Sequence, residues 1–172
     1  MSTDILEQET FGGLTLNSFR ASAMFERTFD EGMALVEECA RYLDGRGSTE
    51  SRTLSRKAAL VYAGESMRVT TRLMQAASWL LIQRAVHEGD MTTEDAASDR
   101  YRLGAREICM GKREEGMDGL PGKLLELLER SESLYRRIAR LDDELFRHGD
   151  AAAGVQSQMA RLSAAFSTGD VG

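Results

Sequence analysis

The stretch that decides the fold runs from Ser51 to Glu88 and reads SRTLSRKAALVYAGESMRVTTRLMQAASWLLIQRAVHE. It contains no proline and one glycine, Gly64, and the pair Gly89-Asp90 ends it. Apolar residues recur in it at helical spacing. One row of them advances in steps of seven residues: Leu60, Met67, Met74 and Leu81. The pattern predicts one helix over 51–88, about 57 Å long.

This predicted helix is apolar or small-sided around most of its circumference. Further apolar residues beside the seven-residue row are Tyr62, Val69, Leu73, Ala76 and Leu80. A row of small side chains on the other side consists of Gly64, Thr71, Ser78 and Ala85. A surface helix usually keeps one whole face for water. Because this one keeps only a narrow polar strip, two neighbouring helices would not cover it, and we predict a homodimer.

Two other stretches predict long helices, over 18–44 and 121–147. The first carries apolar residues in steps of three and four, and Gly45 suits a helix end. The second has leucines in steps of seven, a pattern typical of helix bundles, and Pro121 suits a first turn. Thr92 and Asp95 predict the start of a shorter helix over 93–109. We therefore expect an all-α, antiparallel (up-down-up) three-helix bundle with helices crossing at about 20°.

Both ends of the chain differ from this bundle. Residues 1–15 lack a sustained period and end near Gly12-Gly13, which predicts a flexible arm. Residues 16–148 form the predicted bundle domain. Residues 149–172 are rich in Ala, Ser and Gly, which predicts a disordered tail.

Composition excludes several classes of protein. The 172 residues suit one domain, and the net charge of −6 opposes binding to nucleic acid. Two cysteines form neither a disulfide framework nor a zinc quartet. No apolar run reaches the roughly 18 residues of a membrane span, and the first ten residues do not resemble a signal peptide. We expect a cytoplasmic protein without membrane insertion.

Catalytic and metal-binding patterns are sparse. The sequence has no glycine-rich phosphate loop and no His-Glu-x-x-His pair. Glu144 and His148 would supply at most two metal ligands, and His87 suits the end of a helix. Cys39 and Cys109 are interpreted as small buried apolar residues. We therefore expect no enzyme activity, no cofactor and no metal site.

Two sets of residues are candidates for protein contacts instead. The first is the polar strip of the central helix: Glu65, Arg68, Arg72, Gln75 and Trp79. Trp and Arg are enriched where binding energy concentrates, so the strip is a candidate dimer or partner interface. The alternative is that Glu65 pairs with Arg68 inside the helix and Trp79 packs in the bundle. The second set is a candidate docking face in the tail: Val155, Met159, Leu162 and Phe166. Its alternative is chance periodicity in a disordered end.

The sequence of the long helix over Tyr62–Val86 resembles the RcdA family of alphaproteobacteria. The segments Glu31–Glu38 and Tyr42–Gly45 of the first helix resemble it too. The similarity is extended rather than a short motif. It covers about 17–103 and, more loosely, Ser133–Ile138.

The resemblance implies more than the residues show by themselves. RcdA stands for regulator of CtrA degradation, and family members are dimeric, non-enzymatic helical proteins of regulated proteolysis in the cell cycle. It implies an adaptor that helps deliver substrates such as the response regulator CtrA to the ClpXP protease. It also implies action together with CpdR and the cyclic-di-GMP-binding PopA, and a place at the cell pole. No catalytic motif is carried over.

Two rival interpretations remain. A helical DNA-binding regulator would use the arginines of 100–106 and 136–140, although acidic residues lie among them and the net charge is negative. Another regulatory protein outside proteolysis would act by protein contact alone. A metal-binding bundle ranks after these two.

Overall fold

The computed structural model describes residues 22–113 and 115–167. Within these ranges the chain is helical and has no strand, which confirms the predicted all-α class. Three long helices dominate it: α2 (Ala23–Asp44), α4 (Arg56–Glu88) and α7 (Gly122–Ser167). The shorter elements are α3 (Arg46–Ser51), α5 (Thr93–Ala96), η1 (Asp99–Tyr101), α6 (Arg106–Cys109) and η2 (Met117–Gly119). The predicted N-terminal arm, residues 1–15, lies outside the described ranges.

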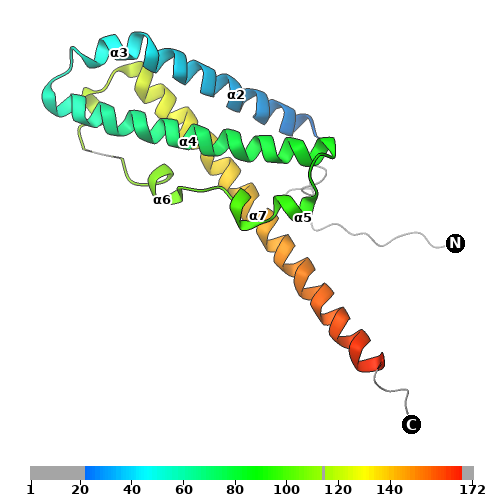
Figure 1. Ribbon diagram of the computed structural model, residues 1–172. Helices are drawn as coiled ribbons and strands as arrows, with labels where there is room; N and C mark the ends of the chain where they lie inside the picture. The colour runs from blue at the N-terminus through cyan, green and yellow to red at the C-terminus, as the bar shows by residue number, and fades with distance from the viewer. Residues whose placement is uncertain (1–21, 114, 168–172) are drawn as a thin grey trace.

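The three long helices pack around one core (Figure 1). Helices α2 and α4 are antiparallel, since Arg84 near the end of α4 pairs with Glu26 near the start of α2 at 3.1 Å. Helices α4 and α7 run in the same general direction, because Arg72 bonds to Leu128 and, further along both helices, Trp79 bonds to Asp142. Here the structure differs from the predicted up-down-up order. The long connection 89–121 returns along the bundle before α7 begins, which a short loop would not allow.

The ends of the helices follow local capping chemistry. The Ser55 hydroxyl accepts a hydrogen bond from the Ala58 amide at 3.2 Å and so caps α4. Gly89 ends α4 where the sequence predicted, and it does so in the left-handed conformation, φ +84°. The predicted helix 51–88 is too long at its start, because residues 46–51 form the separate α3 and a turn precedes Ser55.

The predicted helix 93–109 is wrong in its middle. It begins as expected, with the Thr92 hydroxyl accepting from the Asp95 amide at 3.0 Å. The segment then breaks into α5, η1 and α6, with Arg102 extended and Ala105 at φ +56° between the pieces. Its few apolar residues would leave a continuous helix without a buried face, and side chains from α4 and α7 bind its backbone instead.

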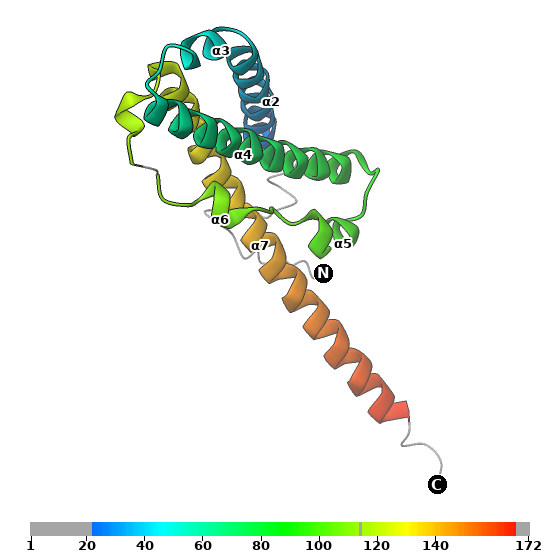
Figure 2. The same cartoon turned by 60° about the vertical axis from the view of Figure 1, so that its left-hand side comes forward.

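The third long helix extends further than predicted. The sequence placed its end near 147 and a disordered tail at 149–172, whereas α7 continues to Ser167. Residues 149–167 contain six alanines and no proline, and each of their two glycines, Gly149 and Gly154, costs a helix only about 1 kcal/mol relative to alanine. In Figure 2 this end of α7 projects beyond the bundle, away from α2 and α4.

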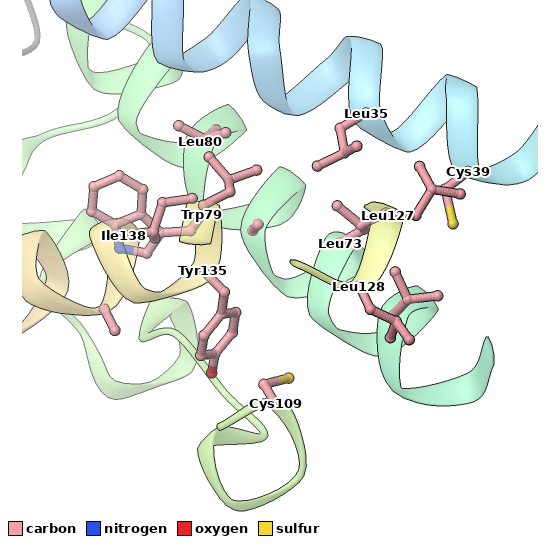
Figure 3. Packing of buried hydrophobic residues seen from close by; sticks show 14 of the residues in the cluster. Leu35, Cys39, Leu73, Trp79, Leu80, Cys109, Leu127, Leu128, Tyr135 and Ile138 are labelled. Atoms are coloured by element: carbon pink, nitrogen blue, oxygen red, sulfur yellow. The ribbon is translucent and has the colours of Figure 1, made fainter. Parts of the chain in front are cut away.

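The core lies where the three long helices meet (Figure 3). Side chains that are at most 3% exposed come from each of them: Phe25, Leu35 and Cys39 from α2; Leu73, Trp79 and Leu80 from α4; Leu127, Tyr135 and Ile138 from α7. Cys109 of α6 is also fully buried and closes the core at one edge. The core therefore includes the broken connection as well as the long helices.

Candidate interaction surfaces

The polar strip of α4 lies inside the chain. Glu65, Arg72 and Trp79 are each 2% exposed, and Arg68 and Gln75 are half-buried. The returning segment 102–113 and helix α7 cover the strip. The prediction that it forms a dimer or partner interface is therefore replaced by a role within the monomer. The alternative interpretation holds: Glu65 pairs with Arg68 at 3.6 Å, and Trp79 packs in the bundle.

Arg72 fixes two other elements to α4. Its Nε and Nη2 donate to the Cys109 carbonyl at 3.0 and 2.8 Å. Its Nη1 donates to the Leu128 carbonyl and the Ser131 hydroxyl at 3.1 and 3.0 Å. Burial lowers the pKa of Arg72, but a guanidinium stays charged at neutral pH. A buried charge that is solvated by protein carbonyls is a structural anchor.

Asp142 of α7 likewise fixes other elements to its own helix. Its Oδ1 accepts from the Trp79 indole at 3.0 Å and from the Leu103 amide at 3.2 Å. Its Oδ2 accepts from Arg106 at 2.8 Å, and Asp143 pairs with Arg106 at the same distance. The hydrogen bonds that Arg106 donates to Asp143 are the largest cause that raises the pKa of Arg106. Asp142 thus joins α4, α7 and the connection at one buried point.

The exposed apolar surface of α4 lies elsewhere. Exposure is 71% for Leu60, 72% for Met67, 65% for Met74 and 52% for Leu81. We call these four residues the α4 row. Between them lie exposed residues that are small and uncharged: Ala63, Gly64, Thr70 and Ser78. Sequence reasoning found this seven-residue repeat but gave the interface to the polar strip, because the repeat alone does not say which row faces the core.

The predicted tail docking face lies on the projecting end of α7. Val155, Met159, Leu162 and Phe166 all belong to this helix. The Met159 side chain is 63% exposed. The side chains of the other three lie outside what the structure describes. The prediction of a docking face therefore remains a prediction, now on a helix rather than on a disordered segment.

The described residues show no constellation typical of catalysis. Cys39 and Cys109 are buried, as predicted, and desolvation raises the pKa of both thiols. Buried thiols with a raised pKa are poor nucleophiles. Among residues 22–113 and 115–167, no three His, Cys, Asp or Glu side chains are grouped to hold a metal ion. In the same part of the chain, no helix combines the length and the apolarity that crossing a bilayer requires.

The structure defines an all-α protein with an exposed apolar row on α4, and comparison with known proteins identifies its family. Residues 16–166 match a family model described as "Protein of unknown function (DUF1465)". A solved structure described as the crystal structure of RcdA from Caulobacter crescentus CB15 is 52% identical in sequence, with a TM-score of 0.61. The match covers 76% of this chain and 97% of that chain. The chain therefore belongs to the RcdA family. Comparison with curated proteins finds no match.

Proposed function

We propose that this chain is a non-enzymatic adaptor of regulated proteolysis. It helps deliver substrates, among them the response regulator CtrA, to the ClpXP protease. Its partners are CpdR and a PopA-type adaptor, at the cell pole of a bacterial cell. The observation that carries the proposal is its 52% identity to RcdA over nearly all of that chain. The apolar α4 row and the projecting end of α7 support it, because an adaptor works through exposed contact surfaces.

Reconstitution tests the adaptor role. Purified ClpXP, CpdR, a PopA-type protein with cyclic-di-GMP, and CtrA are combined with and without this chain. We expect faster CtrA degradation when it is present and no degradation of the chain itself. Unchanged CtrA turnover across a full titration of the chain would contradict the proposal. A substrate that ClpXP degrades without an adaptor controls for nonspecific stimulation of the protease.

We further propose that the adaptor is a homodimer joined along the α4 row. The row extends from Leu60 to Leu81, 21 residue steps or about 31 Å of helix, and exposes four large apolar side chains. Small residues beside it, such as Gly64 and Ser78, allow a second helix to come close. The row is also nearly palindromic: an antiparallel copy of α4 sets Leu60 opposite Leu81 and Met67 opposite Met74.

The area and energy of this row favour a second copy. Fully burying one such side chain stabilises by about 1.5–3 kcal/mol. Because these side chains are 52–72% exposed in the monomer, the eight of a two-fold dimer contribute up to about 8–16 kcal/mol. The loss of free motion on association costs about 4–15 kcal/mol. A symmetric apolar seam is also the usual form of a homodimer interface.

The projecting end of α7 is the second proposed contact of the adaptor. Deleting residues 150–172 removes the candidate docking face, Val155 to Phe166, but none of the described tertiary contacts of α7, which lie at Asp143 and before. We expect the shortened chain to lose only the circular dichroism signal of the helical residues 150–167, to keep the thermal unfolding of the bundle, and to deliver CtrA more slowly. Equal delivery by both forms would remove the docking role. Loss of helix content in the bundle would show that the deletion acts on the fold.

A further inference from the structure

The charged residues at the two ends of α4 oppose the dipole of their own helix. Arg56 and Lys57 lie in the first turn, where the dipole is positive, and no acidic residue lies in that turn. Glu88 is the last residue of α4, where the dipole is negative. A helix is stabilised by acidic residues in its first turn and by basic residues in its last turn. Local preferences that are broken at both ends of one helix point to a contact outside the monomer that compensates them.

Within the monomer these charges have few partners. Arg56 and Glu88 are both exposed. Among the described residues Arg56 has no ion-pair partner, and Glu88 pairs only with Arg84, one turn earlier in the same helix, at 3.5 Å. Lys57 is different, because it lies beside the segment 115–119, which contains two acidic residues of its own. Arg56 is therefore the cation of the first turn that is left without an acid.

The α4 row lies between these two charges. Arg56 precedes Leu60 by four residues, about one turn, and Glu88 follows Leu81 by seven, about two turns, so both lie close to the face that carries the row. In the antiparallel dimer proposed for the row, Leu60 lies opposite Leu81 of the second copy. The same register sets Glu88 level with position 53 of the second copy. That position is three residues from Arg56, about 4.5 Å along the axis, which an arginine side chain spans.

We infer that Arg56 of each copy pairs with Glu88 of the other, one ion pair at each end of the α4 row, and that these pairs set the antiparallel direction. The inference rests on the proposed homodimer. The row alone allows both directions, because leucine faces leucine and methionine faces methionine in either. In a parallel dimer, however, Arg56 would meet Arg56 and Glu88 would meet Glu88, so that like charges face each other. In the antiparallel dimer each charge also lies beside the end of the second helix whose dipole attracts it.

Charge reversal tests the inference, with sedimentation equilibrium of the full chain at physiological salt. Arg56→Glu and Glu88→Arg each place like charges at both ends of the row. We expect each to raise the dissociation constant of the dimer about tenfold, equivalent to about 1.4 kcal/mol. The double variant Arg56→Glu, Glu88→Arg should return it to within about threefold of the parent value. Each single change favours the dipole of α4, so a weaker dimer cannot be attributed to a weakened helix.

Mixing the two single variants tests whether the pairs join separate copies. A mixed dimer of Arg56→Glu with Glu88→Arg carries opposite charges at both ends, and it should form in preference to either homodimer. Such rescue between two chains requires a contact between copies. Higher salt should weaken the parent dimer and strengthen the dimers of the single variants, because it screens attraction and repulsion alike. Arg140→Glu is the matched control, since it makes the same charge change at an exposed position of α7, and it should leave the affinity unchanged.

The failure of this inference is distinguishable from the failure of the dimer. A parent chain that is a monomer at tens of micromolar would remove the homodimer, and the ion pairs with it. A parent dimer whose affinity is matched by both single variants would keep the α4 row as the seam and overturn the role of Arg56 and Glu88. An equal loss of affinity in Arg140→Glu would also overturn that role, because net charge alone would then explain the result.

Discussion

At the scale of single residues, the structure depends on a buried arginine that the sequence offered as a surface residue. Arg72 is 2% exposed and donates to carbonyls on two other segments. Arg72→Met keeps an unbranched apolar chain of similar length but leaves the Cys109 carbonyl without its donor. A buried unpaired acceptor costs about 1–3 kcal/mol. We expect the free energy of unfolding to fall by about 2–4 kcal/mol, measured by urea denaturation.

Arg41→Met is the matched control for this prediction. Arg41 lies on α2 with its side chain 72% exposed and pairs only with Glu37 along the same helix, according to the described contacts. Substituting such a residue changes stability by about 0.5 kcal/mol or less. If both variants unfold at the same urea concentration, Arg72 is not the anchor described here.

Gly47 shows a second residue whose role depends on packing. It lies in the short helix α3, where alanine would ordinarily be preferred by about 1 kcal/mol. A Cβ at this position would lie 2.7 Å from the Tyr62 hydroxyl and 2.8 Å from the Tyr42 carbonyl, which is backbone. We therefore expect Gly47→Ala to lower stability by about 1–3 kcal/mol, against its helix propensity. Thermal unfolding measures this loss, and Gly122→Ala is the control: its added Cβ would meet nothing within 4 Å, so it should cause little change.

At the scale of helices, the sequence predicted the elements whose periodicity is strong. The seven-residue repeats of Leu and Met placed the body of α4 and the first part of α7 correctly, and Gly89 marked where α4 ends, although the predicted start of α4 was five residues too early. The broken segment 93–109 was missed, because its hydrogen bonds go to Gln75, Arg72 and Asp142, which are distant in sequence. Such tertiary bonds leave no local period for sequence reasoning to detect.

The candidate sites were harder to predict than the helices for the same reason. The sequence pattern of an arginine followed at helical spacing by a tryptophan is the same whether the two side chains face a partner protein or the interior. Only the packing of α7 and of segment 102–113 against α4 decides between these two orientations. That packing buries Arg72 and Trp79. The α4 row, by contrast, was visible as a repeat. Its exposure could be predicted only by knowing which neighbours α4 has and where they lie.

The packing of α2 against α7 includes a pair of contacts that respond to pH. Glu38 of α2 accepts from Lys123 at 2.6 Å and pairs with Arg130 at 2.9 Å, both on α7. The hydrogen bond from Lys123 is the largest cause that lowers the pKa of Glu38 below 4.5. A lowered pKa means that this stabilisation is fully present at neutral pH. It is lost as the pH falls below 4.5 through the pKa of the folded state.

We therefore expect Glu38→Gln to reduce the loss of stability on acidification. The difference from the parent chain should be largest at pH 7 and should shrink by about pH 3, with a size of about 1 kcal/mol or less for so exposed a group. Urea denaturation at several pH values measures it. Glu37→Gln controls for the general effect of removing an acid. Among the described contacts, Glu37 pairs only with Arg41, which lies in the same helix. A Glu38→Gln curve parallel to the parent curve at all pH values would contradict the prediction.

At the scale of the whole molecule, the main feature to explain is the apolar surface that the α4 row exposes to water. Four large apolar side chains in one line, between 52% and 72% exposed, form a patch that monomeric proteins seldom carry without a partner. The polar strip of α4 lies in the interior, where Arg72 binds segment 102–113 and Trp79 binds α7. Because the polar strip is buried, the apolar row remains exposed, which is the basis of the proposed dimer.

The double variant Met67→Glu, Met74→Glu tests this arrangement. In an antiparallel dimer the two positions face each other near the symmetry axis, so each copy would bring two carboxylates into an apolar seam and against like charges. We expect the dissociation constant of the dimer to rise by about 100-fold or more, equivalent to about 2.7 kcal/mol. Light scattering at micromolar concentration should then report a monomer, where the parent chain reports a dimer. Both residues are exposed in the monomer, so its circular dichroism spectrum should not change.

Ser133→Glu supplies the control, because it adds a carboxylate at an exposed position of α7. It should remain a dimer. If the parent chain is itself a monomer at these concentrations, or if the double variant still dimerises with undiminished affinity, the α4 row is not the seam. A dimer that dissociates in the double variant and also loses CtrA delivery would connect assembly to function. One that dissociates and delivers normally would show that delivery does not require the dimer.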